Sequence, residues 1–384
     1  MKKRKNLLLL TEYFPVSEDA ETTGGVEARV FDLVKGLSHS YKITVLCSRQ
    51  AGQPKETTVF DARVLRPGPI LPYSSKGFLV RRILTVLAIL IKGLTLKPDI
   101  VEGCSFMMYW QAFLIGMLTG AKKCATWHET WIGEWIKNKG ILTGIFGSIW
   151  ERVSIKLPWD CIISISNSTK KRLLERRVTC KNITVIPNGF NYAHLEKISA
   201  KKTSTPSIVF LGRLTPQKDV GTLLHAVKEI AKKIADIQCH IVGGGPSEAE
   251  WKQLSEKLGI QKNVIFHGHQ EKKADYLLKG KQCHIFVSPS LLEGFGIALL
   301  DAMAMGLPVV VSDIEPFKEV TRNGKGGFIF KQKDYKDLAK KAVILLTNKK
   351  VYAQKCSEAK ELAATYDWQT IIKQYEKVYA KVLS

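Results

Sequence analysis

The sequence predicts an α/β protein built from two doubly wound domains, each with a parallel β-sheet. With 384 residues the chain exceeds one ordinary hydrophobic core, because single domains usually hold roughly 100–200 residues. Short apolar segments of strand length alternate with amphipathic segments of helix length along almost the whole chain, which is typical of βαβ units. The alternation stops between residues 190 and 207 and then begins again, so the chain divides into two halves.

The first domain is predicted over residues 1–190. It begins with an apolar strand at 6–10, and Gly24-Gly25 then precedes a helix at 26–37 whose apolar residues recur at helical spacing. The half ends at the turn Pro187-Asn188-Gly189. Apolar runs predict the remaining strands at 43–47, 100–102, 124–127, 161–165 and 183–186.

The polar stretch 191–206 is the predicted linker, and the second domain follows over 207–365. Residues 366–384 predict a basic amphipathic helix, which could pack back on the first domain. The strands predicted for the second domain lie at 208–211, 239–242, 264–266, 284–287 and 309–312.

The chain is strongly basic. It has 58 Lys and Arg against 35 Asp and Glu, a formal charge of +23, and this excess predicts an anionic partner. Nucleic acid, phospholipid headgroups and phosphorylated small molecules all satisfy that condition. With 45% apolar and 24% charged residues, the composition excludes a largely disordered chain, a collagen-like chain and a small disulfide scaffold.

The eight cysteines never form a C-x-x-C pair, which favours buried thiols in a reducing compartment over a metal site or a disulfide framework. The apolar run after Lys2-Lys3-Arg4-Lys5 covers only residues 7–10, too few for a signal peptide. The longest apolar run, 83–91, is far below the roughly 20 residues that span a bilayer. We therefore expect a cytoplasmic protein, whose membrane contact would be peripheral, at the inner face.

Polar residues and glycines follow the predicted strands, at the edge where doubly wound sheets bind ligands. Arg213 and Lys218 follow strand 208–211, and a planar guanidinium together with an ammonium suits a diphosphate, although two solvated surface cations would explain them equally well. The glycines at 243–245 allow close backbone approach to a ligand or simply make a turn. They do not form G-x-G-x-x-G, which disfavours a dinucleotide oxidoreductase.

The segment Glu293-Gly294-Phe295-Gly296 lies between a strand and the helix predicted at 297–305. Its glycines leave backbone N–H groups uncovered at a helix N-terminus, where the helix dipole favours an anion. Asp301 lies eight residues after Glu293, about two helical turns, so both carboxylates can share one side. Carboxylates beside an anion site suit hydroxyl ligands, such as those of a sugar and a ribose.

With these motifs the sequence resembles glycosyltransferase family 4, retaining nucleotide-sugar transferases with the GT-B fold, in which two Rossmann-like domains face each other across a cleft. The resemblance covers nearly the whole chain in order and spacing. It is carried by Gly24-Gly25-Val26-Glu27, His128, residues 185–189, Gly212-Arg213-Leu214 with Lys218, residues 243–246, Pro289-Ser290, Glu293-Gly294-Phe295-Gly296 and residues 302–310.

The resemblance implies four catalytic residues. Arg213 and Lys218 would neutralise the donor diphosphate and then the leaving nucleoside diphosphate, Glu293 would lie near the transferred sugar, and His128 would contact that sugar. Asp301 would bind the ribose hydroxyls, where the family normally has the longer Glu. The implied donor-binding residues are Gly24, Gly25, Gly244, His269, Gly294, Phe295, Gly296, Ile297 and Asp301.

We expect no metal and no other cofactor, because the sequence has no short Asp-x-Asp motif and no clustered His and Cys. The nucleotide diphosphate sugar, a UDP- or GDP-sugar, would be a substrate. Arg213, Lys218 and the helix amides would supply the charge stabilisation, and the leaving phosphate would help to deprotonate the acceptor on the same face.

The acceptor is expected to be a glycan or a lipid-linked hydroxyl, with an anionic membrane surface as a further partner. The apolar stretch 78–96 is edged by basic residues, as in membrane-interface segments. A second region with interleaved basic residues is rich in tryptophan. Its tryptophans either lie at a membrane interface or fill the core of the domain. They are Trp127, Trp131, Trp135, Trp150 and Trp159.

Two other function classes stay open. Another nucleotide-sugar enzyme of the same fold, an epimerase or a phosphorylase, would share the phosphate residues, and fold analogy alone does not fix the reaction. A non-catalytic nucleic-acid-binding protein would also use the positive charge. No zinc-finger spacing, aromatic RNA-binding signature or basic stripe supports that second class, so no nucleic acid is expected as a partner.

Overall fold

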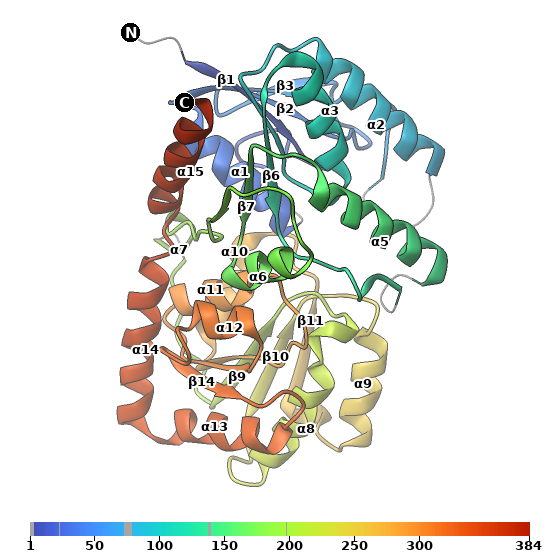
Figure 1. Cartoon of the computed structure of the whole chain (residues 1–384). Helices are drawn as coiled ribbons and strands as arrows, with labels where there is room; N and C mark the ends of the chain where they lie inside the picture. Colours follow the sequence, from blue (N-terminus) through green and yellow to red (C-terminus); the bar gives the residue numbers. More distant parts are fainter. Residues whose placement is uncertain (1–3, 23, 73–78, 137–139, 197) are drawn as a thin grey trace. The chain divides into compact units, whose positions relative to one another are not determined.

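The computed structural model describes residues 4–22, 24–72, 79–136, 140–196 and 198–384. The chain forms two compact units, each an α/β layered domain (Figure 1). The first comprises Met1–Asn188 together with Trp368–Ser384, and the second comprises Gly189–Asp367. The expected pair of Rossmann-like domains is confirmed.

The first unit has an eight-stranded sheet in the order β3-β4-β2-β1-β5-β6-β7-β8, parallel except for the β3–β4 pair. Alternate residues of β1 point to opposite faces, so Leu7 and Leu9 join one hydrophobic core and Leu8 and Leu10 the other. The strands are β1 (Lys5–Leu10), β2 (Tyr41–Leu46), β3 (Glu56–Val59), β4 (Ala62–Leu65), β5 (Ile100–Gly103), β6 (Lys122–Trp127), β7 (Cys161–Ser164) and β8 (Ile183–Val185).

Helices cover both faces of this sheet. The core around Leu7 and Leu9 includes residues of α1 and α15, whereas α3 contributes to the core around Leu8 and Leu10. The helices of the unit are α1 (Gly25–Leu37), α2 (Leu79–Leu94), the 3-10 turn η1 (Phe106–Met108), α3 (Tyr109–Thr119), α5 (Ile141–Lys156), α6 (Asn167–Glu175) and α15 (Trp368–Leu383).

The second unit has a six-stranded sheet, parallel throughout, in the order β11-β10-β9-β12-β13-β14. Its strands are β9 (Ser207–Leu211), β10 (Gln238–Val242), β11 (Val264–Gly268), β12 (Ile285–Ser288), β13 (Val309–Ser312) and β14 (Gly327–Phe330). Its helices are α7 (Ala193–Glu196), η2 (Pro216–Lys218), α8 (Val220–Ala231), α9 (Glu248–Lys257), η3 (Gln261–Asn263), α10 (Lys273–Gln282), α11 (Ile297–Ala304), α12 (Glu315–Val320), α13 (Tyr335–Thr347) and α14 (Lys349–Ala364).

The boundaries of the two units in the structure differ slightly from the domain boundaries predicted from the sequence. Residues 191–206, expected as a linker, fall within the second unit, where Thr203 N–H donates to the Gln282 carbonyl at 2.9 Å. The Lys281 ammonium also donates to the Ile198 carbonyl at 2.6 Å. Helix α15 belongs to the first unit, with Tyr375 and Tyr379 in its core.

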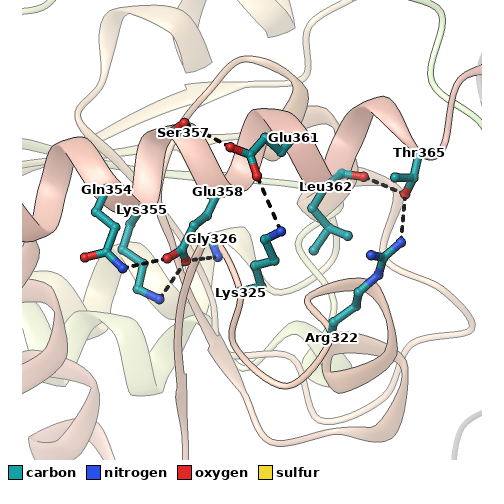
Figure 2. Close-up of polar contacts among 10 residues, drawn as sticks. All are labelled: Arg322, Lys325, Gly326, Gln354, Lys355, Ser357, Glu358, Glu361, Leu362 and Thr365. Atoms are coloured by element: carbon teal, nitrogen blue, oxygen red, sulfur yellow. Dashed lines mark hydrogen bonds and ion pairs between the residues drawn. The ribbon is translucent and has the colours of Figure 1, made fainter.

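Helix α14 anchors the turn that precedes β14 (Figure 2). The Glu358 carboxylate accepts hydrogen bonds from Gly326 N–H at 2.9 Å and from the side chains of Lys355 and Gln354, each at 2.8 Å. Burial raises the pKa of Glu358, but these donors outweigh burial and lower the pKa to about 2. An ionised Glu358 therefore fixes this turn at neutral pH.

The tryptophans of the first unit are buried or half-buried. Trp127 and Trp159 are buried in its core, and the Trp127 ring stacks on Tyr109 with centroids 4.1 Å apart. All eight cysteines are free, and seven of them are buried, as their spacing predicts. No helix in the described ranges is long and apolar enough to cross a membrane.

Candidate functional site

Four loops follow β9, β10, β11 and β12 at the carboxyl edge of the second-unit sheet, and they carry most of the predicted site residues. Because these strands are parallel neighbours, their ends meet at one edge. The loop after β9 presents Arg213 as an exposed side chain and continues into the turn that holds Lys218. A sheet edge with two cations on one loop is chemically suited to an anion.

Lys218 and Glu293 form an ion pair between the β9 and β12 loops. The Lys218 ammonium lies 2.5 Å from Glu293 Oε1, and both side chains are about one fifth exposed (23% and 17%). Ser290 Oγ donates to the same oxygen at 3.0 Å. The backbone also joins the loops, since Leu291 N–H donates to the Gln217 carbonyl at 2.8 Å. The structure thus brings two of the predicted catalytic residues together in a fixed geometry.

The residues after Glu293 form the N-terminus of α11. Gly296 has φ +103°, and a Cβ there would lie 2.8 Å from the Phe317 ring, so the position favours glycine. Phe295 is buried and packs edge-on against Tyr366 with ring centroids 5.8 Å apart. The Phe295 side chain is therefore structural, and only its backbone can contact a ligand. Gly294 and Ile297 flank this N-terminus and are partly exposed.

The glycines after β10 are required by the backbone of the β9 loop. A Cβ on Gly243 would lie 1.9 Å from the Gly212 carbonyl oxygen, and one on Gly245 would lie 2.2 Å from the Leu214 carbonyl oxygen. The Leu214 N–H donates to the Gly244 carbonyl at 2.9 Å. Close packing against the β9 loop is therefore enough to explain why glycines follow β10. This packing also fixes the path of the loop that carries Arg213.

His269 follows β11 with an exposed side chain, and it is adjacent to Gly244. A Cβ on Gly244 would lie 3.4 Å from His269 Cβ. These two predicted donor-binding residues therefore come from neighbouring strands and meet at the same edge.

Asp301 lies in an environment that the sequence motifs do not reveal. Its carboxylate is almost fully buried, with 4% of the side chain exposed, and it pairs with the Lys273 ammonium from α10. Burial, the Asp301 charge and a hydrogen bond to Asp301 raise the pKa of Tyr276 well above its usual value. Lys273 also lies over the Tyr276 ring, 4.7 Å from its centroid. Lys273 and Tyr276 thus lie beside a predicted site residue, although no sequence motif indicated them. The only sequence signal is their spacing of three residues, which places both on one side of helix α10.

In the first unit, His128 follows β6 and is held by the β5 loop. Its Nε2 lies 2.9 Å from the Cys104 carbonyl oxygen. A carbonyl only accepts, so Nε2 carries the proton and Nδ1 is an acceptor. Burial, together with the positive charge of Arg29, lowers the pKa of His128 to about 3. The ring is neutral at physiological pH and suited to accept a hydrogen bond from a hydroxyl.

Gly24 and Gly25 begin α1 in the same unit. Gly24 is the N-cap with extended backbone, and its carbonyl accepts the Ala28 N–H at 2.9 Å. Gly24 and Gly25 thus lie at the N-terminus of a helix, where the first backbone N–H groups have no partner within the helix. Glu129, which follows His128, instead accepts the Trp131 indole N–H at 2.8 Å.

Two histidines, one on β10 and one on β11, are expected to make the second unit sensitive to acid. His240 Nδ1 lies 2.9 Å from His267 Nε2, and burial, then the nearby His267 and Lys279 charges, lower the pKa of His240 to about 4. An unfolded histidine titrates near ~6.5, so the unfolded state binds more protons as the pH falls below that value. Full stability is present above ~6.5 and is lost as the pH falls toward the folded-state pKa.

We expect this pair to lower the free energy of unfolding of the second unit by about 1 kcal/mol on acidification to pH ~5, allowing for its partial exposure. Calorimetric unfolding temperatures across that pH range will measure the loss. His240→Gln should flatten the pH dependence relative to the wild type. An unchanged slope in the variant would assign the acid sensitivity to other groups.

Among the described residues, no group of three or more His, Cys, Asp or Glu side chains could hold a metal ion. The cationic side chains at this sheet edge are Arg213, Lys218 and Lys273.

Two family models match the chain, and together they cover most of it. The model described as "Glycosyltransferase Family 4" matches residues 23–194, and the model described as "Glycosyl transferases group 1" matches residues 192–362. The change from one to the other lies close to the boundary between the two units.

Known proteins agree with these matches. A phosphatidyl-myo-inositol mannosyltransferase of Mycobacterium leprae is 31% identical over 232 residues, which are 59% of this chain and 61% of that protein. The chain thus covers less than two thirds of that relative. The solved sucrose-phosphate synthase of Thermosynechococcus elongatus covers 99% of both chains with a TM-score of 0.83 at 18% identity. Anabaena HepE, solved in complex with UDP-glucose, covers 98% of this chain and all of that one with a TM-score of 0.75 at 16% identity. Both solved structures have the same fold as this chain.

Proposed function

The chain belongs to glycosyltransferase family 4, and on that premise we propose that it transfers a hexose-type sugar from a nucleotide diphosphate sugar to a hydroxyl acceptor, with retention of configuration. The observation that supports this proposal most directly is the linked pair of loops after β9 and β12. They hold Lys218 against Glu293 at 2.5 Å, next to the N-terminus of α11. A cation, a carboxylate and the backbone amides of a helix N-terminus match a diphosphate that carries a polyhydroxylated sugar.

In the proposed reaction, the acceptor oxygen forms a bond to the anomeric carbon while the bond from that carbon to the diphosphate oxygen breaks on the same face. The acceptor proton passes to the departing phosphate oxygen. Arg213, Lys218 and the α11 amides stabilise the charge that develops on the leaving group. Glu293, already paired with Lys218, and the neutral His128 provide acceptors for sugar hydroxyls. Charge stabilisation by these groups does not require a divalent cation.

The donor is proposed to be a UDP- or GDP-hexose. HepE was solved in complex with UDP-glucose, and the Mycobacterium leprae relative is a mannosyltransferase. That relative's name also includes a phosphatidyl-inositol acceptor. We propose a lipid-linked or glycan acceptor for this chain and a place at the cytoplasmic side of a membrane.

A thermal-shift screen tests the donor. We expect UDP, GDP or one of their sugar conjugates to raise the unfolding temperature in a concentration-dependent way, since a ligand at about 100 times its Kd stabilises the fold by about 2.7 kcal/mol. Nucleoside monophosphates are the matched control, because they lack the second phosphate. No stabilisation by any nucleoside diphosphate or nucleotide sugar would contradict the proposed function.

Product analysis separates the transferase from an epimerase or a phosphorylase. A transferase releases nucleoside diphosphate in proportion to the glycosylated acceptor. An epimerase changes the sugar without release of nucleotide, and a phosphorylase requires free phosphate. Nucleotide release that depends on a hydroxyl acceptor is the expected outcome.

A further inference from the structure

The outward surface of the first unit has an unusual concentration of large apolar side chains. In the described part of the chain, 14 of the 18 exposed large apolar residues lie on three helices, six on α2, two on α3 and six on α5. These residues are Val80, Ile83, Leu84, Leu87, Ile91, Leu94, Met117, Leu118, Ile141, Leu142, Ile145, Phe146, Ile149 and Val153. We call them the aliphatic face.

On α2 and α5 the exposed residues follow helical periodicity, so each of these two helices has one apolar stripe directed away from the core. On α2 the stripe runs from Val80 to Leu94, and Ile91 is 66% exposed. The opposite side of α2 is already packed, since Ile89 is buried and a Cβ on Gly93 would lie 2.2 Å from Ile115 of α3. A surface helix normally turns its polar side outward, and α2 does the reverse.

Helix α5 has the same arrangement. Its inner side is glycine-rich and closely packed, and a Cβ on Gly147 would lie 2.5 Å from the Trp135 ring. Its outer side has Leu142, 85% exposed, and Phe146, 54% exposed. Trp135 therefore packs on the inner side of α5, and Leu142 and Phe146 lie on its exposed outer side.

The three helices are neighbours within the first unit (Figure 1). α2 packs on α3, and Trp110 of α3 meets Trp150 of α5 with ring centroids 5.5 Å apart. Exposed apolar surface of this extent marks an interaction site rather than ordinary surface variation.

The charges on these helices select the partner. The only acidic residue on them is Glu151, which is buried, 1% exposed, and accepts the Trp131 N–H and the Trp135 indole N–H. Basic side chains edge the aliphatic face instead, and Arg81, Arg152 and Lys156 are exposed. Lys and Arg beside an apolar surface suit anionic lipid headgroups above an acyl layer. A second copy of the chain would present the same positive charges and would be repelled.

We propose that the aliphatic face of α2, α3 and α5 is a docking surface for an anionic lipid bilayer. The helices lie in the plane of the interface, with the aliphatic side chains among the upper acyl groups and Arg81, Arg152 and Lys156 at the headgroups. The surface is separate from the nucleotide chemistry of the second unit and does not depend on the proposed donor.

Vesicle co-sedimentation with the full chain tests this surface. We expect the wild type to bind vesicles of phosphatidylcholine with phosphatidylglycerol at least about tenfold more tightly than vesicles of phosphatidylcholine alone, and to lose this preference at high salt. The apolar variant combines Ile83→Ser, Ile91→Ser, Leu142→Ser and Phe146→Ser. It should bind anionic vesicles at least about tenfold more weakly, because exposed side chains no longer enter the bilayer.

A charge variant gives an independent measurement. Arg81→Gln, Arg152→Gln and Lys156→Gln remove three charges, which should weaken binding about a hundredfold at low salt. The matched control, Lys233→Gln, Lys257→Gln and Lys377→Gln, removes the same charge from exposed positions elsewhere and should bind like the wild type. Leu174→Ser with Ile265→Ser is the corresponding apolar control.

Thermal unfolding and nucleotide-induced stabilisation should be unchanged in all these variants, since every substituted side chain is exposed and outside the candidate donor site. Equal vesicle binding by the charge variant and its control would overturn the proposal. Equal binding of the wild type to vesicles with and without phosphatidylglycerol would also overturn it. Concentration-dependent dimers that the apolar variant loses, without vesicle binding, would assign the aliphatic face to a second copy and reject the membrane.

Discussion

Alanine at Arg213 or at Lys218 is expected to lower kcat by about 10²–10³, because losing one preorganised donor to developing negative charge raises the barrier by about 3–4 kcal/mol. Both side chains follow β9, at the edge where the α11 N-terminus also lies. Their charge is most valuable when the diphosphate departs, so the loss should fall on kcat more than on KM.

The two substitutions should differ in detail. Lys218→Ala leaves the Glu293 carboxylate with the Ser290 hydroxyl but without its ammonium partner. Arg213→Lys keeps the charge yet loses the planar fork, and we expect activity between those of the wild type and Arg213→Ala. The matched control is Lys233→Ala, an exposed lysine of the same unit. Steady-state kinetics with the donor found by thermal shift will measure each value, and near-normal turnover in both alanine variants would remove these residues from the chemistry.

The central strands could be predicted because each is a short apolar run buried on both faces. β9, for example, is buried at every position. β3 could not be predicted in this way, because it is an edge strand with only Val59 buried. β3 and β4 are joined through Phe60 and Asp61, both with positive φ (50° and 64°), a turn that lacks the usual glycine. β14 is also an edge strand, and only Gly327 and Phe330 of it are buried.

Site residues within one motif could be predicted from spacing, and their partners in space could not. Glu293 lies just before the N-cap of α11 and Asp301 lies within that helix, so the two are close in sequence and belong to one continuous loop-and-helix segment. Lys273 meets Asp301 only because α10 and α11 pack onto the same sheet, a fact that no local pattern contains. From the sequence, the glycines at 243–245 suit either a ligand or a turn, and the carbonyls of Gly212 and Leu214 show why the turn requires Gly243 and Gly245.

The role of Arg29 in α1 could not be predicted from the sequence, because its partners are more than a hundred residues away in sequence. The side chain is 3% exposed, and its guanidinium donates to the carbonyls of Ile186 and Pro187, each at 2.8 Å. It also donates to Asn188 Oδ1 at 2.7 Å and to the Tyr375 hydroxyl at 2.9 Å. Arg29 thus joins the last residues of the first segment of this unit to the returning helix α15.

Replacing Arg29 by methionine should therefore lower the free energy of unfolding of the first unit by about 3–5 kcal/mol. Methionine fills much of the volume but leaves two carbonyls and an amide oxygen buried without a donor. It also removes the positive charge that acts on the fully buried Glu102, whose pKa is raised by burial despite hydrogen bonds from Thr126 and Tyr379. Tyr375→Phe removes only one hydroxyl and should cost about 1 kcal/mol.

Urea unfolding followed by tryptophan fluorescence isolates this unit, since every tryptophan except Trp251 belongs to it. Arg152→Met is the matched control, because it makes the same substitution at an exposed position of α5 and should leave the midpoint unchanged. The Arg29→Met transition should move to lower urea while nucleotide-induced stabilisation of the second unit persists. A wild-type midpoint in Arg29→Met would show that the first unit holds α15 without this guanidinium.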